Sequence, residues 1–234
     1  YTGATGRRTP PLVMGHEATG EVVAVGPAVT AVAPGDRVFA MPMHWCGACP
    51  ACRNGAFDLC PERKVYGGDL PGAFAELFLI SERTAIPIPD EVSYGQAALI
   101  EPLAVVIKGL ARAHIAAGDG AVVIGGGPIG LIATAVLALH HPRPLVVLEP
   151  LATRREIARA LGATLVLDPT AEDAAAQVEE ATHGLGADVT VVDEIESAVA
   201  LTEQVLAETQ AHPDRVRAEM DRVRRQLTTG FPET

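Results

Sequence analysis

All four cysteines of this 234-residue chain fall within one short stretch. They follow the spacing C-x2-C-x2-C-x7-C and are Cys46, Cys49, Cys52 and Cys60. A cluster of thiolates suits tetrahedral Zn²⁺, and the nearby Gly47, Pro50 and Gly55 allow the tight turns that such a site needs. Four sulfur ligands leave no open position for a substrate. The spacing therefore favours a structural zinc site over a catalytic one.

Two other uses of these thiols remain open. Two disulfides fit the cysteine count but require an oxidising compartment, whereas thiols clustered in this way indicate a reducing one. The run from Cys46 to Cys60-Pro61 also resembles that of the bacterial ferredoxins, which hold iron–sulfur clusters. Its last spacing is seven residues where the ferredoxin run has three, and no second set of cysteines exists.

A second candidate site is the glycine cluster Gly125–Gly130, which matches G-x-G-x-x-G. It follows an expected strand at 121–124 and opens an expected helix at 129–139, which is the context of a dinucleotide-binding loop rather than of a tight turn alone. The amides at the helix N-terminus would hold the pyrophosphate. Glu149 would accept hydrogen bonds from the adenosine ribose, which favours NAD over NADP, although Arg154 and Arg155 temper this preference. The expected cofactor-binding residues are Gly125, Gly127, Pro128, Ile129, Gly130, Glu149 and Arg154.

His16 and Glu17 form a third candidate, although a lone pair of this kind is more often structural. The pair belongs to the stretch Gly15-His-Glu-x2-Gly-x5-Gly26, and further along the chain stand Gly35-Asp-Arg-Val38 and Glu101-Pro-Leu-Ala104. Together with the cysteine and glycine clusters, these stretches resemble the zinc-dependent medium-chain alcohol and polyol dehydrogenases over roughly residues 1–192.

The resemblance implies an α/β protein with a GroES-like, β-rich catalytic domain followed by a Rossmann domain that binds NAD. It implies a structural zinc in the cysteine cluster and a catalytic zinc at His16, Glu17 and Glu101, completed by a cysteine upstream of His16. Such a zinc lowers the pKa of the bound alcohol, so that hydride passes to the nicotinamide. Glutamate at 101 favours a secondary alcohol or polyol as the small-molecule substrate. The resemblance also implies a homo-oligomer, either a dimer or a tetramer.

The chain departs from the family pattern at both ends. It begins at Tyr1, and no cysteine precedes His16, so we expect a truncated member with both domains incomplete, weak binding of the catalytic zinc, exposed strand edges and marginal stability. The alternative is a non-catalytic zinc- and nucleotide-binding member, or a structural module. The segment after residue 193 does not match the family. It is expected to form a helix at 194–208 and then an amphipathic stripe of Val216, Met220, Val223 and Leu227.

The composition of the chain argues against two classes of binding partner, nucleic acids and membranes. The net charge is −11 and aromatic residues make up 4% of the chain, which argues against binding nucleic acid. Glycine, proline or charge interrupts every apolar stretch, so we expect no membrane span and a cytoplasmic protein.

The secondary structure expected to position these residues changes along the chain from short strands to alternating strands and helices. Short strands are expected at 21–25, 36–40, 73–80 and, as an edge, 84–89. Helix-compatible sequence follows at 97–117, and then strands at 121–124, 145–148, 165–167 and 189–192 alternate with helices, which indicates a parallel sheet. We expect a catalytic domain at 1–100, a Rossmann domain at 101–193 and a helical tail at 194–234.

Overall fold

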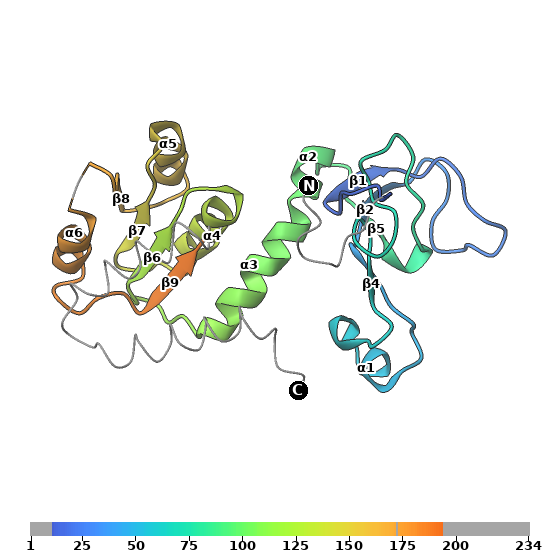
Figure 1. The fold of residues 1–234 in the computed structure, drawn as a ribbon, viewed down its shortest axis with the longest axis horizontal. Coiled ribbons are helices and arrows are strands. Elements are labelled where there is room, and N and C mark those ends of the chain that lie inside the picture. Colours follow the sequence, from blue (N-terminus) through green and yellow to red (C-terminus); the bar gives the residue numbers. More distant parts are fainter. Residues whose placement is uncertain (1–10, 172, 194–234) are drawn as a thin grey trace. The chain divides into compact units, whose positions relative to one another are not determined.

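The computed structural model describes residues 11–171 and 173–193 (Figure 1). The chain divides into two compact units between Ala104 and Val105. Helix α3, Ile100–Ala113, contains this division. The helix expected at 194–208 and the apolar stripe expected after it lie outside the described residues.

The first unit is built from short strands and turns. One antiparallel sheet has the order β1-β2-β5, with Val38 opposite both Gly20 and Pro87. Strands β3 and β4 form a separate antiparallel pair. The strands are β1 Ala18–Glu21, β2 Arg37–Ala40, β3 Met43–His44, β4 Lys64–Val65 and β5 Ala85–Pro87, and the helices are α1 Pro50–Arg53 and α2 Tyr94–Ala98, with 3₁₀ turns at Phe57–Leu59 and Glu82–Thr84.

One expected strand is wrong in extent and another is absent. Strand β1 stops at Glu21 instead of covering 21–25, because its partner β2 begins only at Arg37, after a turn at Gly35 whose φ is +97°. Residues 73–80 contain no strand. A strand needs a hydrogen-bonded neighbour, and no strand of the described chain pairs with this segment. Its apolar side chains, such as Leu79, are consequently exposed.

The second unit is a four-stranded parallel sheet in the order β8-β7-β6-β9. Its strands are β6 Ala121–Ile124, β7 Leu145–Leu148, β8 Leu165–Leu167 and β9 Val189–Val192, and its helices are α4 Pro128–Ala138, α5 Ala152–Ala160 and α6 Ala174–Ala181. The alternation of strands and helices confirms the expected α/β fold. Helix α6 was not expected. Asp173 caps it by accepting a hydrogen bond from Ala176 N, and this capping aspartate before an alanine-rich run was the available sequence signal.

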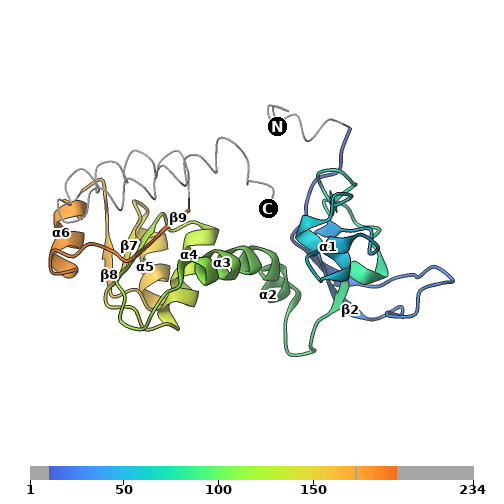
Figure 2. The ribbon, with the colours of Figure 1, turned by 90° about the horizontal axis from the view of Figure 1, so that it is seen from below.

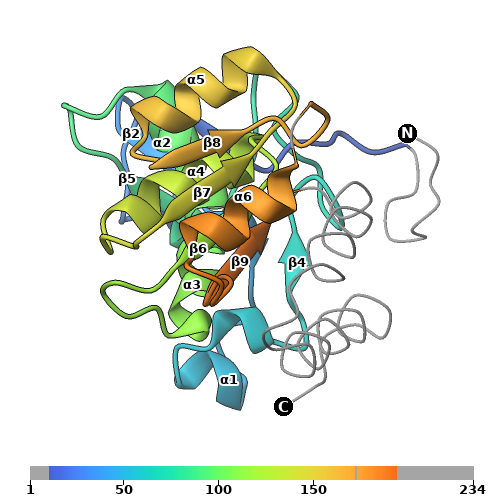
Figure 3. The same ribbon diagram turned by 90° about the vertical axis from the view of Figure 1, so that its left-hand side faces the viewer.

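Helices cover both faces of the parallel sheet, as can be followed in Figures 2 and 3. Alternate residues of each strand point to opposite faces, so Val123 and Val147 pack with Leu137 of α4, while Val146 packs with Val178 of α6. Strands buried on both faces explain the unbroken apolar runs in the sequence. Among the described residues, no helix has both the length and the apolar character needed to cross a membrane.

Candidate functional site

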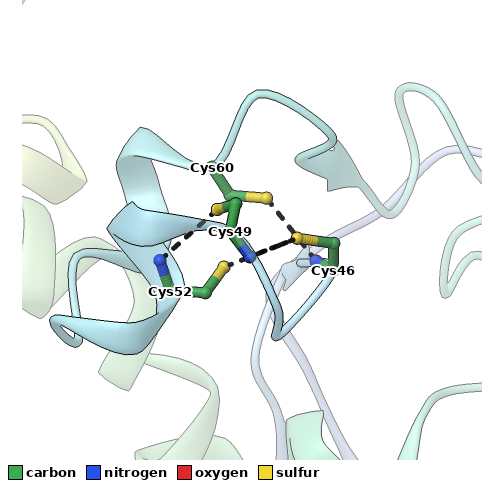
Figure 4. Close-up of side chains that lie close together, drawn as sticks. All are labelled: Cys46, Cys49, Cys52 and Cys60. Carbon is green, nitrogen blue, oxygen red and sulfur yellow. Dashed lines mark hydrogen bonds between the residues drawn. The ribbon is translucent and has the colours of Figure 1, made fainter.

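The cysteine cluster lies on a compact loop of the first unit. Cys49 caps helix α1, where its sulfur accepts a hydrogen bond from Cys52 N, and Pro50 starts the helix with the φ that a first turn requires. Cys60 follows the 3₁₀ turn Phe57–Leu59. The ring of Phe57 stacks on Trp45 with the centroids 4.5 Å apart. These short elements bring the four sulfurs within 4.8 Å of one another and turn them toward a common centre (Figure 4).

The spacing of these sulfurs fits a tetrahedral zinc ion. Sulfurs bound at about 2.3 Å in a tetrahedron lie about 3.8 Å apart, and Cys46 Sγ is 3.9 Å from Cys52 Sγ. Backbone amides also point at the sulfurs, because Ala48 N and Cys49 N donate to Cys46 Sγ at 3.5 and 3.4 Å. Amide donors favour the thiolate form that binds metal.

Two of the thiols differ in acidity. The amide donors Ala48 N and Cys49 N lower the pKa of Cys46 to about 7, whereas burial raises the pKa of Cys52 to about 12. Metal binding at this cluster releases thiol protons, because the thiolate is the form that binds metal. All four cysteines are free, so none is held in a disulfide. The cluster fits structural zinc, and its closed donor set leaves no position for a substrate.

A second cluster in the same unit joins His16, Glu17 and Glu101. One ligand atom from each side chain lies within 4.8 Å of the other two. His16 and Glu17 come just before β1, and Glu101 lies in the first turn of α3, where a carboxylate also interacts favourably with the helix dipole. Helix α2, which leads into α3, is fixed by a capping box between Ser93 and Gln96.

The electrostatics of this second cluster are those of an acidic pair beside an imidazole. Burial raises the pKa of Glu101; the His16 imidazole works against this rise, and the Glu17 carboxylate adds to it. A cation held among the three side chains would relieve the repulsion between the carboxylates. His16 and Glu17 also line an open groove of about 1170 Å³. The donor set therefore fits a divalent metal that a small molecule can reach.

The glycine cluster of the second unit forms the turn from β6 into α4. Gly125 has a φ of +96°, and its amide donates to Leu148 O at the end of β7. Gly127 caps α4, and Pro128 occupies the first helical position. The free amides at this helix N-terminus are suited to bind a phosphate. Arg154, which the sequence analysis placed among the cofactor-binding residues, is half-exposed beside this turn.

Glu149 follows β7 and is only 2% exposed. Its carboxylate accepts hydrogen bonds from Gly126 N at 2.6 Å and from Leu151 N at 2.7 Å, and Arg154 lies 3.9 Å away. Sequence reasoning assigned Glu149 to the ribose alone. Here the residue also holds the glycine turn in place, because its side chain bridges the ends of two neighbouring strands.

One further residue near this turn, Asp193, was missed. A side chain at Gly127 would overlap the carboxylate of Asp193, which directly follows β9. Asp193 reaches the turn because β9 pairs with β6 and the carboxyl ends of neighbouring parallel strands meet at one edge of the sheet, a pairing for which the sequence carries no local signal. Arg155 is held by Glu149 O, Pro150 O and the Asp168 carboxylate, so Arg154 is the more accessible of the two arginines.

Comparison with known proteins agrees with this arrangement. Residues 1–90 match the family described as the alcohol dehydrogenase GroES-like domain. The chain is 39% identical over 190 residues to 2-dehydro-3-deoxy-L-galactonate 5-dehydrogenase of Pseudoalteromonas atlantica, covering 81% of this chain and 55% of that protein. It is 37% identical over 186 residues to L-threonine 3-dehydrogenase of Pyrococcus abyssi, covering 80% and 53%.

A solved structure shares the fold. It is a provisionally assigned zinc-binding dehydrogenase from Sinorhizobium meliloti 1021 bound to NADP, 33% identical with a TM-score of 0.74, covering 82% of this chain and 57% of that one. The present chain spans about half the length of the curated relatives that it matches. Residues 1–90 thus belong to the alcohol dehydrogenase GroES-like domain family, and in its sequence and fold the chain is similar to dehydrogenases of the zinc-dependent medium-chain alcohol and polyol type.

Proposed function

We propose that this chain serves an NAD-dependent, zinc-dependent dehydrogenase that transfers a hydride between a secondary alcohol or polyol and NAD. The observation that carries the proposal is the convergence of His16, Glu17 and Glu101 beside an open groove, in a chain that also has a glycine turn built for a dinucleotide. The first unit would be the catalytic domain and the second the dinucleotide-binding domain.

Each group has a role that follows from its chemistry. The imidazole of His16 and the carboxylates of Glu17 and Glu101 would hold a catalytic zinc, and the four cysteines would hold a structural one. A zinc ion held there would supply Lewis acidity, which would lower the pKa of the substrate hydroxyl, and a bound nicotinamide would be the hydride acceptor. The amides at the start of α4 would fix the pyrophosphate.

The carboxylate at position 101 favours a polyol-type substrate. Two relatives are named for oxidising hydroxyl groups on a deoxy-galactonate and on L-threonine, each a secondary alcohol beside other polar groups. The Glu149 carboxylate, already engaged by two backbone amides, would repel a ribose 2′-phosphate and so supports NAD. Half-exposed Arg154 opposes this preference, which makes the comparison of NAD with NADP part of the test. The homo-oligomer implied by the family resemblance stays a prediction.

The test is NAD reduction by the zinc-loaded chain with a panel of sugar alcohols, L-threonine, simple secondary alcohols and ethanol, followed by NADH absorbance. We expect turnover with secondary alcohols and a loss of at least about 100-fold in Glu101→Gln, because a zinc ligand is removed. The exposed Glu91→Gln is the matched control and should retain activity. A zinc-loaded chain that reduces neither NAD nor NADP with any member of the panel would contradict the proposal.

A further inference from the structure

Three glycines outside both metal clusters meet directly before His16. Gly15 and Gly67 have φ values of +99° and +71°, a region that favours glycine, and Gly67 and Gly72 are buried. Gly67 comes from the loop after β4, and Gly72 follows it five residues later. Their backbones pack against the backbone of Gly15 without any side chain between them.

The space at these glycines is too small for even a methyl group. A Cβ on Gly72 would overlap Gly15 O and would lie 2.6 Å from both Gly67 Cα and Met14 O. A Cβ on Gly67 would lie 2.6 Å from Gly15 O and 2.8 Å from Gly15 N. All of these neighbours are backbone atoms, so no side chain can rotate away to make room. A substitution must instead move the chain at 14–15.

Hydrogen bonds hold the same segments together. Gly72 N donates to Val13 O at 2.7 Å, Phe74 N to Met14 O at 2.8 Å and Ala73 N to Gly15 O at 3.0 Å. We call the paired segments 13–15 and 72–74 the glycine clasp. The clasp ends one residue before His16, so it fixes the direction in which the chain enters the metal cluster.

The loop that supplies Gly67 is itself firmly held. Gly67 N donates to Leu70 O at 2.7 Å, and the Asp69 carboxylate accepts from Val65 N at 2.8 Å. Leu70 N also donates to Val65 O. This hydrogen-bonded turn holds Gly67 where its backbone meets that of Gly15.

We propose that Gly67 and Gly72 are positioning residues for the metal cluster of His16, Glu17 and Glu101. The inference rests on the proposed function in that this cluster binds a metal. Metal–ligand distances tolerate only about ±0.2 Å, and the loss of a supporting contact around a metal site typically weakens binding by about 10–100-fold. A methyl group that pushes segment 13–15 aside would displace His16 and Glu17 relative to Glu101.

The test compares Gly72→Ala with the wild-type chain. The control is Gly95→Ala, an exposed helical glycine with ordinary φ and no atom near its added methyl. The cysteine cluster is first filled with zinc, and cobalt is then titrated into the remaining site while the visible spectrum is recorded. We expect cobalt affinity to fall about 10–100-fold in Gly72→Ala and to be unchanged in Gly95→Ala, with the first zinc retained in both variants. The His16→Ala variant should abolish the cobalt signal, which assigns it to this cluster.

A metal-free measurement separates this inference from the proposed function. Hydrogen exchange at the amides of Ala73 and Phe74, and the NMR signals of the His16 ring, report the glycine clasp directly. Both should change in Gly72→Ala and stay unchanged in Gly95→Ala. If the wild-type chain bound no cobalt, the metal site of the proposed function would fail, and these signals would still decide the positioning role. Unaltered exchange and His16 signals in Gly72→Ala, or unaltered cobalt affinity, would overturn the inference.

Discussion

Replacing Gly130 by alanine tests the glycine turn of the second unit most sharply. A Cβ there would overlap Gly125 O and would lie 3.0 Å from Gly125 C and 3.3 Å from Asp193 Cβ. Carbon atoms pack best at about 3.5–4.0 Å, so the contact with Gly125 C alone requires α4 to retreat by about 0.5–1 Å, and the overlap with Gly125 O requires more. Overpacking of this kind lowers the free energy of unfolding by about 1–3 kcal/mol. The retreat also moves the amides that we propose to bind the pyrophosphate, and a loss of about 1.4 kcal/mol in binding free energy weakens NADH affinity tenfold.

The assay combines urea unfolding, followed by far-UV circular dichroism, with NADH titration. Gly120→Ala is the matched control, because its added methyl would find its nearest neighbours at an ordinary 3.6 Å. Trp45, the single tryptophan, lies in the first unit, so its fluorescence reports that unit separately. The reasoning would be refuted by a Gly130→Ala chain that unfolds at the wild-type urea concentration and binds NADH with wild-type affinity.

Three further outcomes are expected. Cys60→Ser should remove the zinc of the cysteine cluster and the proton release that accompanies its binding, as measured by metal analysis and a pH-indicator titration; a zinc content per chain equal to that of the wild-type chain would contradict this. Leu137→Ala, at a position with 0% exposure, should lower the free energy of unfolding by about 2–5 kcal/mol, whereas exposed Leu139→Ala should change it little in the same urea assay. Hydrogen bonds from Thr170 and the Arg155 charge lower the pKa of Asp168. Its stabilising effect is therefore present above the unfolded pKa of about 4 and lost as pH falls through the lower folded value. Asp168→Asn should consequently destabilise at pH 6, with the difference from wild type shrinking in acid; an equal difference at all pH values would refute it.

The parallel sheet could be predicted because its signals are local. Each of its strands is a short run of buried apolar residues, and the glycine turn after β6 carries its own spacing. The cysteine cluster was equally accessible, because all of its ligands lie close together in sequence.

The sequence-based predictions failed where a structure depends on contacts between segments that are far apart in the sequence. Residues 73–80 have strand-like composition, but a strand exists only beside a hydrogen-bonded neighbour, and composition does not reveal the neighbour. The hydrogen bond by which Glu149 holds the glycine turn, and the contact of Asp193 with that turn, likewise depend on which strands lie side by side. The glycine clasp joins segments far apart in sequence, so the spacing of its glycines gives no signal.

Native mass spectrometry of the full chain in the presence of zinc and NADH tests the central claim most directly, because it counts both partners on one molecule. The account predicts a species that carries zinc and one NADH, that loses a zinc in Cys60→Ser and that loses NADH in Gly130→Ala. A chain that binds neither zinc nor NADH under these conditions would contradict the account.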